Sequence, residues 1–376
     1  VGMRLTDGWT PGQHIYFVAK FSKPFEAVRY VDDHKFIGSS EEFASKSRQA
    51  ILTFADGKEP VIAKVGISAV SYEGARNNLE AEGAAYGFDF DSVRSDARKM
   101  WSDLAGRVRI EGGTEKQRRT FYTALYHTAV VPDVTSDCDG SFRRNNDEIA
   151  KCTFGKSYST LSLWDIFRAW LPLSSLIYPN QLHDIVFSCL DMYKADGVLP
   201  LWPLASGETE CMIGYHSIPF IVDAYFKGLV PELDTDLALE AMTVSSDINA
   251  KGSSYYTKLG YIPANKLREN VSAALEYAYD DWCIARFAEA AGRTDIAERY
   301  YGRAHNFINN FDGSTGFLRG RNLDGSMVDP FNPFETSREY TEANAWQYRF
   351  FTPQDFKGLG QLLGGEDKLI EALDGL

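Results

Sequence analysis

The sequence predicts a multidomain β + α fold, with strands at the start of the chain and helices over the rest. Short apolar runs at 15–19, 50–54 and 61–67 are separated by polar or glycine-containing turns, a pattern typical of strands in a sheet or sandwich. From residue 72 onward the apolar residues recur at helical spacing, and loops rich in Pro and Gly join the helices in pairs. Paired helices favour an α/α toroid or stacked helical hairpins.

The helical pattern starts directly after the strands and is interrupted once, by Glu111-Gly-Gly-Thr, before it resumes. We therefore predict a strand domain at 1–85, a linker at 86–112 and a helical domain at 113–376. The predicted helices lie at 72–84, 91–105, 114–129, 160–176, 179–195, 214–228, 234–247, 268–291, 293–311, 341–351 and 366–375. Because the last of them reaches the end of the chain, we expect the helical domain to be incomplete.

Composition narrows the functional classes. The formal net charge of −13 repels phosphate backbones, which disfavours nucleic acid as a partner. No run approaches the roughly 18 consecutive apolar residues of a membrane helix, so we expect no membrane span. Aromatic residues make up 14% of the chain, more than a core tends to use, and sugar-binding clefts are one place for such rings. The five cysteines form no CxxC pair and indicate neither a zinc site nor a disulfide framework.

A first candidate site lies in the segment 158–170, which is apolar nearly all round except for Asp165 and Arg168. These two residues are three apart and would share one face of a helix. A buried carboxylate is costly unless it is paired. Asp165 is therefore either half of a structural ion pair or an acceptor for sugar hydroxyls beside Trp164, and the residues alone do not decide.

A second candidate is the long aromatic loop at 199–216, which carries Glu208, Glu210 and His216. Loops that mix turn residues, rings and carboxylates often carry function, so we expect Glu208 to contact a ligand. The alternative is that both glutamates complement the N-terminus of the following helix. His216 is interpreted as a buried core histidine with satisfied hydrogen bonds.

Two acidic segments follow. Glu276 and Asp280 are four residues apart on a predicted helix, where like charges repel unless a cation, a shared proton or a ligand relieves them. We favour a structural role for this pair and for the neighbouring Asp281.

Further on, Glu342 lies among rings and amides, which suits a general acid for glycosidic cleavage. From the residues alone, however, a helix cap formed by Thr341 with Glu342 in the first turn is favoured.

Several of these segments together resemble glycoside hydrolase family 92, the calcium-dependent exo-acting α-mannosidases. The matching stretches, in family order, are IYFVAKFSKPF, EGGTEKQRRTFYTALYHT, YSTLSLWDIFRAWLPL, GVLPLWPLASGETECMIGYHS, LEYAYDDWCIA, TGFLRGR and YTEANAWQY. The resemblance implies an N-terminal β-sandwich and a C-terminal (α/α)6 toroid. It further implies inverting hydrolysis of mannose-containing glycans, with Ca²⁺ as cofactor and a periplasmic or extracellular location.

The resemblance also assigns residues. It places the general acid on Glu342, which reverses the preference for a helix cap. Asp165 resembles the residue that contacts the terminal mannose, with Trp164, Arg168 and Glu208 as its neighbours. In the family, the base and the main calcium ligands lie downstream of the segment that matches YTEANAWQY. We therefore expect them to lie beyond Leu376, with the metal ligands unknown, and expect the chain by itself to be weakly active or inactive.

Two other functions stay open. The chain could belong to a non-catalytic mannose-binding protein that keeps the aromatic cleft. It could also belong to another toroidal glycosidase or lyase that acts on a different sugar.

Overall fold

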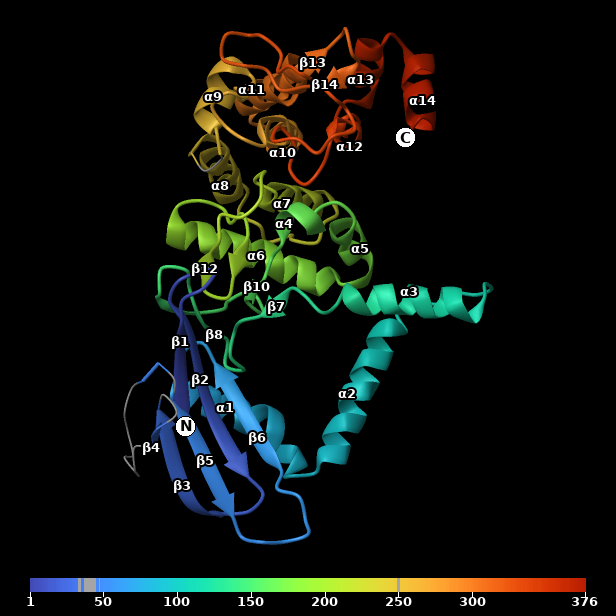
Figure 1. Cartoon of the computed structure of the whole chain (residues 1–376). Helices are drawn as coiled ribbons and strands as arrows, with labels where there is room; N and C mark the ends of the chain where they lie inside the picture. The colour runs from blue at the N-terminus through green and yellow to red at the C-terminus, as the bar shows by residue number, and fades with distance from the viewer. Residues whose placement is uncertain (33–34, 37–44, 47, 249–250) are drawn as a thin grey trace. The chain divides into compact units, whose positions relative to one another are not determined.

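The computed structural model describes residues 1–32, 35–36, 45–46, 48–248 and 251–376. These residues fall into two compact units, the first made of Val1–Leu5, His14–Arg109 and Asp137–Ser141, and the second of Thr6–Gln13, Ile110–Ser136 and Phe142–Leu376. The predicted order, a β-rich part followed by a helical part, is confirmed (Figure 1). Among the described residues, no helix has both the length and the apolar composition of a membrane span.

The first unit contains two three-stranded sheets. One has the order β1-β2-β6 and the other the order β4-β3-β5. In the first sheet β2 and β6 are antiparallel, with Tyr16 opposite Ser68 and Phe21 opposite Ala63. The strand bounds are β1 Gly2–Thr6, β2 Gln13–Phe21, β3 Phe25–Asp32, β4 Lys35–Phe36, β5 Gln49–Phe54 and β6 Ala63–Ser68. The three predicted strands are confirmed, and β1, β3 and β4 are additional.

Helix α1 (Tyr72–Gly83) packs directly on β6, and Gly66 is the point of closest approach. A Cβ atom at Gly66 would lie 2.3 Å from the Ala75 carbonyl oxygen, so only glycine fits there. Val18, Ala75 and Leu79 form the small core beneath the helix. A short 3₁₀ turn (Ala84–Tyr86) and α2 (Phe90–Ala105) follow.

The second unit is mainly helical. Its α-helices are α3 Glu115–His127, α4 Leu163–Ile166, α5 Trp170–Ile177, α6 Pro179–Asp196, α7 Ser217–Phe226, α8 Thr235–Ile248, α9 Ser253–Leu259, α10 Asn270–Ala290, α11 Thr294–Ala304, α12 Ala345–Tyr348, α13 Phe356–Leu363 and α14 Glu366–Asp374. Its two-stranded pairs are β7 Asp133–Val134 with β10 Tyr158–Ser159, β11 Pro203–Leu204 with β12 Gly207–Glu208, and β13 Phe311–Asp312 with β14 Phe317–Leu318. A further pair joins β8 Ser141–Arg143 to β9 Ile149–Lys151, and a 3₁₀ turn covers Asn306–Asn310.

Three predicted helices differ from the structure, and α9 and α13 correspond to no predicted helix. The segment predicted as one helix at 293–311 contains α11, which ends at Ala304, and then a 3₁₀ turn at Asn306–Asn310. The segment 160–176 forms two helices, α4 and α5, because Pro172 cannot donate to the carbonyl of Arg168 and its ring would clash with that carbonyl in a continuous helix. The chain therefore starts a new helix, and Pro172 lies in the first turn of α5. The segment 341–351 contains only the single turn of α12. Asn344 caps it, with its side chain accepting from Gln347 N at 3.1 Å while the Gln347 side chain accepts from Asn344 N at 3.0 Å. The helix cap at Thr341, which the residues alone favoured before the resemblance reversed that preference, is therefore wrong.

Helix α10 is the central element of the site described below. Its 21 residues are buried nearly all round, including the polar side chains of Ser272, Glu276, Asp280 and Asp281. Burial of these groups requires partners, because an unpaired polar group in the interior costs about 1–3 kcal/mol and an unpaired charge more.

Candidate active site

Glu276 on α10 is fully buried and is bound by side chains from three other elements. Its Oε1 atom accepts from Trp164 Nε1 at 3.0 Å, from Arg168 Nη2 at 2.6 Å and from Tyr348 OH at 3.2 Å. Its Oε2 atom lies 3.2 Å from Nε2 of His216. Burial alone would raise the pKa of Glu276, but the contacts with His216 and Arg168 and their positive charges outweigh it and hold the pKa below its usual value.

His216 is the cation that separates the two carboxylates of the predicted acidic pair. Its Nδ1 atom lies 2.8 Å from Oδ1 of Asp280, and its ring stacks on Phe167 at 4.0 Å between centroids. Burial works to lower the pKa of His216, but the negative charges of Asp280 and Glu276 and the hydrogen bond with Asp280 raise it to about 9. His216 is thus buried as predicted, and it carries a positive charge at neutral pH.

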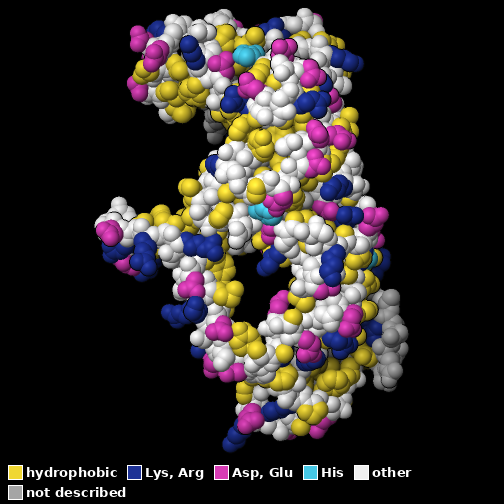
Figure 2. Space-filling view, turned by 180° about the vertical axis from the view of Figure 1, so that it is seen from behind, with side chains coloured by type: hydrophobic (Ala, Val, Ile, Leu, Met, Phe, Trp, Pro, Cys, Tyr) yellow, Lys and Arg dark blue, Asp and Glu magenta, His cyan; other side chains and the backbone are white. Residues whose placement is uncertain are grey.

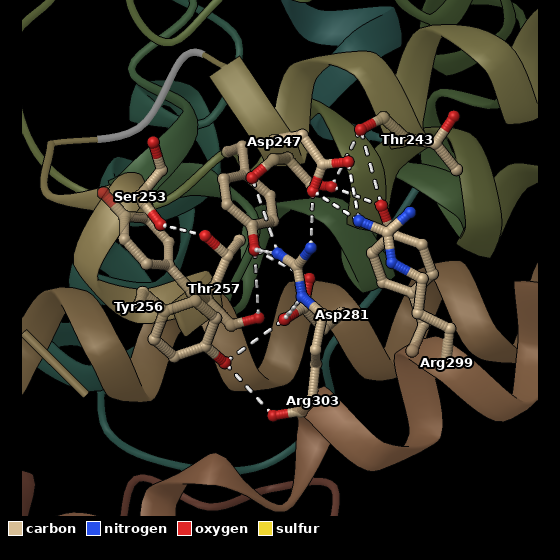
Figure 3. Close-up of polar contacts among 12 residues, drawn as sticks. Thr243, Asp247, Ser253, Tyr256, Thr257, Asp281, Arg299 and Arg303 are labelled. Carbon is tan, nitrogen blue, oxygen red and sulfur yellow. Dashed lines mark hydrogen bonds and ion pairs between the residues drawn. The ribbon is translucent and has the colours of Figure 1, made fainter. Parts of the chain in front are cut away.

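Asp281 points to a different network, although it is adjacent to Asp280 in sequence. It accepts from Tyr215 OH at 2.7 Å and from Arg303 Nε at 2.8 Å, while Arg303 Nη1 also binds Asp247 at 2.7 Å (Figure 3). Burial raises the pKa of Asp281 to about 6, against the lowering effect of Arg303. The contacts drawn in Figure 3 join residues of the protein to one another, which agrees with the structural role predicted for Asp281.

Glu342 has an exposed side chain between two buried neighbours, Thr341 and Ala343. Its φ angle of 50° lies in the left-handed region, which is unfavourable for a residue with a Cβ atom. The preceding residue is fixed because Thr341 N donates to Ser272 Oγ at 2.9 Å. Strained backbone of this kind persists only where the surroundings impose it, and it is frequent at functional sites.

The predicted sugar-contacting segment is only partly as expected. Asp165 was treated as a buried carboxylate, and this premise is wrong, because α4 is a single turn that leaves the side chain exposed and bonded to Ser162 Oγ. Among the described residues Arg168 forms its ion pair with Glu276 and not with Asp165, which removes the structural ion pair considered above. An exposed Asp165 beside Trp164 is available to a ligand.

Glu208 is placed in the hairpin of β11 and β12, away from any helix N-terminus. Its carboxylate accepts from Leu201 N at 2.9 Å, Trp202 N at 2.9 Å and Glu210 N at 2.8 Å. Burial raises the pKa of Glu208, and these backbone hydrogen bonds oppose the shift. The alternative in which Glu208 complements a helix is wrong. Its hydrogen bonds shape the loop, and ligand contact by Glu208 stays a prediction.

No metal centre is evident. Over the residues that the structure describes, no group of three or more His, Cys, Asp or Glu side chains is arranged to hold a metal ion. The described residues therefore supply no complete calcium site, and calcium stays a prediction of the resemblance. Acidic and basic side chains are interspersed on the face of the molecule shown in Figure 2.

The structure thus brings Trp164 and Arg168 together with residues to which the sequence assigned no ligand role, namely Glu276, His216, Tyr348 and Ser272. A signal existed for one of them, since the i, i+4 spacing of Glu276 and Asp280 called for a cation, a shared proton or a ligand, and the structure supplies the cation His216. Nothing in the spacing identified His216 as that cation. Chemically, the arrangement offers two exposed carboxylates, Glu342 and Asp165, on segments fixed by buried polar contacts.

Comparison with known proteins gives matches over almost the whole chain. Residues 1–68 match the glycosyl hydrolase family 92 N-terminal domain, and residues 74–376 match the glycosyl hydrolase family 92 catalytic domain. The α-mannosidase BT3965 from Bacteroides thetaiotaomicron has 33% identity and a TM-score of 0.89, with 99% of this chain and 51% of that chain covered. A structure of BT3965 in complex with mannoimidazole matches with a TM-score of 0.90.

Two further proteins are similar. The inverting mannosidase BT2199 from the same organism has 32% identity and a TM-score of 0.91, again with 99% of this chain and 51% of that chain covered. A protein from Arthroderma benhamiae described as an uncharacterized secreted glycosidase is 25% identical, over 85% of this chain and 42% of its own length. The chain thus spans about half the length of these solved structures.

Proposed function

Because the chain belongs to glycosyl hydrolase family 92, we propose that its protein is an exo-acting α-mannosidase that hydrolyses α-1,2 or related linkages with inversion. The similar structures of BT3965 and BT2199, a mannosidase and an inverting mannosidase, support this proposal, and the mannoimidazole complex of BT3965 supports mannose-containing glycans as ligands. The secreted relative supports a periplasmic or extracellular location.

Glu342 is proposed as the general acid. The observation that carries this assignment is its position: an exposed carboxyl group on a left-handed residue, between Thr341 and Ala343, which are both buried. Such a backbone fixes the direction of the side chain, and a general acid must be held within hydrogen-bond reach of the leaving oxygen. Asp165 is proposed to accept from the hydroxyl groups of the terminal mannose, beside the ring of Trp164.

In the proposed reaction, Glu342 gives its proton to the glycosidic oxygen as the bond to the anomeric carbon breaks. A water molecule attacks from the opposite face of the ring and loses a proton to a carboxylate base, so that an α-mannoside releases β-mannose. The base is not assigned to a residue of this chain. Calcium is retained as an expectation of the resemblance, to be tested by removal with EGTA and readdition, and no step above passes through it.

The test is Glu342→Gln in the protein at its natural length. We expect hydrolysis of α-1,2-mannobiose to fall by roughly 10²–10⁴-fold, while a substrate with an activated aryl leaving group loses less, because its oxygen needs less protonation. NMR of the first product should show the β-anomer. Wild-type rates on mannobiose in the variant would overturn the acid assignment. Binding of mannose without any turnover by the unaltered protein would instead favour a non-catalytic mannose-binding function.

A further inference from the structure

One oxygen atom of Glu276 joins two parts of the proposed active site that are far apart in the sequence. Oε1 binds Trp164 and Arg168 on the segment that contains Asp165, and it also binds Tyr348, which lies six residues after Glu342. Trp164 is 112 residues away in sequence, and Tyr348 is 72 residues away. A displacement of this carboxylate would therefore be transmitted to both segments.

A second contact from the same face of α10 fixes the other side of Glu342. Ser272 is four residues before Glu276, so both side chains lie on one face of the helix. Ser272 Oγ accepts from Thr341 N at 2.9 Å, directly before Glu342, and Glu276 binds Tyr348 after it. The turn that carries Glu342 is thus attached to α10 at both of its ends.

Arg168 adds a further connection between the two segments, through its contacts with aromatic rings. Its guanidinium lies 5.1 Å from the ring centroid of Trp164 and 4.8 Å from that of Phe351, within the range of cation–π attraction. Phe351 follows Tyr348 by three residues and packs against it, with 5.9 Å between ring centroids. Glu276 holds the cation of Arg168 in this position through their 2.6 Å ion pair.

The chemistry favours a charged carboxylate over an amide at this position. Glu276 and Asp280 carry two negative charges, and His216 and Arg168 supply two positive charges around them. An amide at 276 would leave the buried His216 and the partly exposed Arg168 with one negative charge too few. One of its two polar atoms would also be a donor facing other donors.

From this geometry we propose that Glu276 is a positioning residue of the active site: its Oε1 atom holds the segment of Trp164 and Asp165 in register with the turn that carries Glu342. The inference rests on the proposed function, because it gives Glu342 and Asp165 their roles in acid catalysis and in mannose binding. Glu276 itself does not contact the substrate. It acts through Trp164, Arg168 and Tyr348.

Kinetics of Glu276→Gln in the protein at its natural length test the proposal. We expect kcat/KM on α-1,2-mannobiose to fall by roughly 10- to 100-fold, because small misplacements of reacting groups have effects of this size. Glu276→Asp, which keeps the charge, should recover part of the loss. The matched control is Asp281→Asn on the same helix, which breaks an equally buried carboxylate contact outside the site. It should lower stability and leave kcat/KM within about twofold.

A double-mutant cycle separates positioning from general destabilisation. If Glu276 acts through Tyr348, the effects of Glu276→Gln and Tyr348→Phe on kcat/KM should be non-additive, whereas those of Glu276→Gln and Asp281→Asn should add. Additive effects of Glu276 and Tyr348, or an unchanged kcat/KM in folded Glu276→Gln, would overturn the inference. In either case the mannosidase assignment would stand if Glu342→Gln is inactive.

Amide hydrogen exchange gives a readout that does not require activity. In Glu276→Gln, exchange should increase together in residues 163–168 and 341–348, while Asp281→Asn leaves both segments unchanged. An increase in only one segment, or in neither, would overturn the positioning role. If the unaltered protein has no mannosidase activity, the proposed function fails, and this measurement still decides whether Glu276 couples the two segments.

Discussion

The Nδ1 atom of His216 lies 2.8 Å from Oδ1 of Asp280, and the opposite ring nitrogen faces Glu276 at 3.2 Å. One buried imidazolium therefore relieves the repulsion between two carboxylates that are one helical turn apart on α10. The protein stabilises the charged form of His216 and so makes its own stability depend on pH.

The direction in which stability changes with pH can be predicted. The pKa of His216 is raised from 6.5 to about 9 on folding, so its contribution is fully present below pH 6.5 and is lost as the pH rises through about 9. The shift corresponds to a loss on the order of 3 kcal/mol in the free energy of unfolding. Urea denaturation at pH 6.5, 8 and 9.5 would measure it.

His216→Gln should lower stability at pH 6.5 and reduce the slope between pH 6.5 and 9.5. His127→Gln, at an exposed position at the end of α3, is the control and should keep the slope of the unaltered protein. An unchanged slope in His216→Gln would show that His216 is not the titrating group.

A second prediction concerns Gly214, which lies directly against the imidazole of His216. A Cβ atom there would lie 2.1 Å from Nε2 of His216, and the φ angle of Gly214 is +82°. Gly214→Ala should therefore displace the imidazole from Glu276 and cost at least ~3 kcal/mol, comparable to breaking a buried ion pair. Gly197→Ala is a matched control, because φ is +76° and no atom lies within 4 Å of the added Cβ atom.

The control should lose only about 1–2 kcal/mol from backbone strain. Thermal or urea denaturation of both variants measures the difference, which reports the clash with His216 alone. Equal losses in the two variants would mean that the imidazole moves aside without cost.

The network around Asp281 predicts a large effect for Arg303→Met. This change removes the main cation from a fully buried carboxylate and should cost about 3–5 kcal/mol at pH 8. Arg299→Met removes a half-exposed partner of Asp247 and should cost less than about 1 kcal/mol. Because the pKa of Asp281 is already raised to about 6, its protonation should make the loss in Arg303→Met smaller at pH 5. A loss of stability in Arg303→Met that does not change with pH would show that Arg303 stabilises the protein through packing and not through its charge.

Backbone strain at Glu342 predicts an unusual response to glycine. Replacement of an ordinary exposed residue by glycine usually destabilises, since the unfolded chain gains conformational freedom. At Glu342 the relief of left-handed strain, roughly 1–2 kcal/mol, should offset this loss, so Glu342→Gly should be as stable as the unaltered protein or slightly more stable. The measurement is the free energy of unfolding in urea.

Glu335→Gly is the control, because Glu335 is exposed and is not among the residues with positive φ. It should lose about 0.5–1 kcal/mol. If Glu342→Gly loses as much as Glu335→Gly, the left-handed conformation carries no strain and the argument for a constrained acid is weakened.

Much of the fold follows from the sequence, because its signals are local. Short apolar runs bounded by turns identified the strands at 15–19, 50–54 and 61–67, and 3.6-residue spacing identified α6, α8 and α10 within one or two residues of their observed ends. The signals that failed were also local. The helix predicted at 160–176 is interrupted before Trp170, so that Pro172 lies in the first turn of α5, and Asn344, not Thr341, caps the start of α12.

For the site, the sequence alone determined which residues carry unusual chemistry. It identified a carboxylate beside Trp164, an acidic pair on one helix face, and Glu342 among rings and amides. Only the tertiary structure decided which of these carboxylates are buried and which are exposed. Asp165 and Glu342 are exposed, whereas Glu276 and Asp280 are buried and paired with Arg168 and His216. The physical reason is that spacing along a helix fixes its faces, while burial and ion pairing depend on partners far away in the sequence. Arg168 is 108 residues from Glu276, and His216 is 64 residues from Asp280.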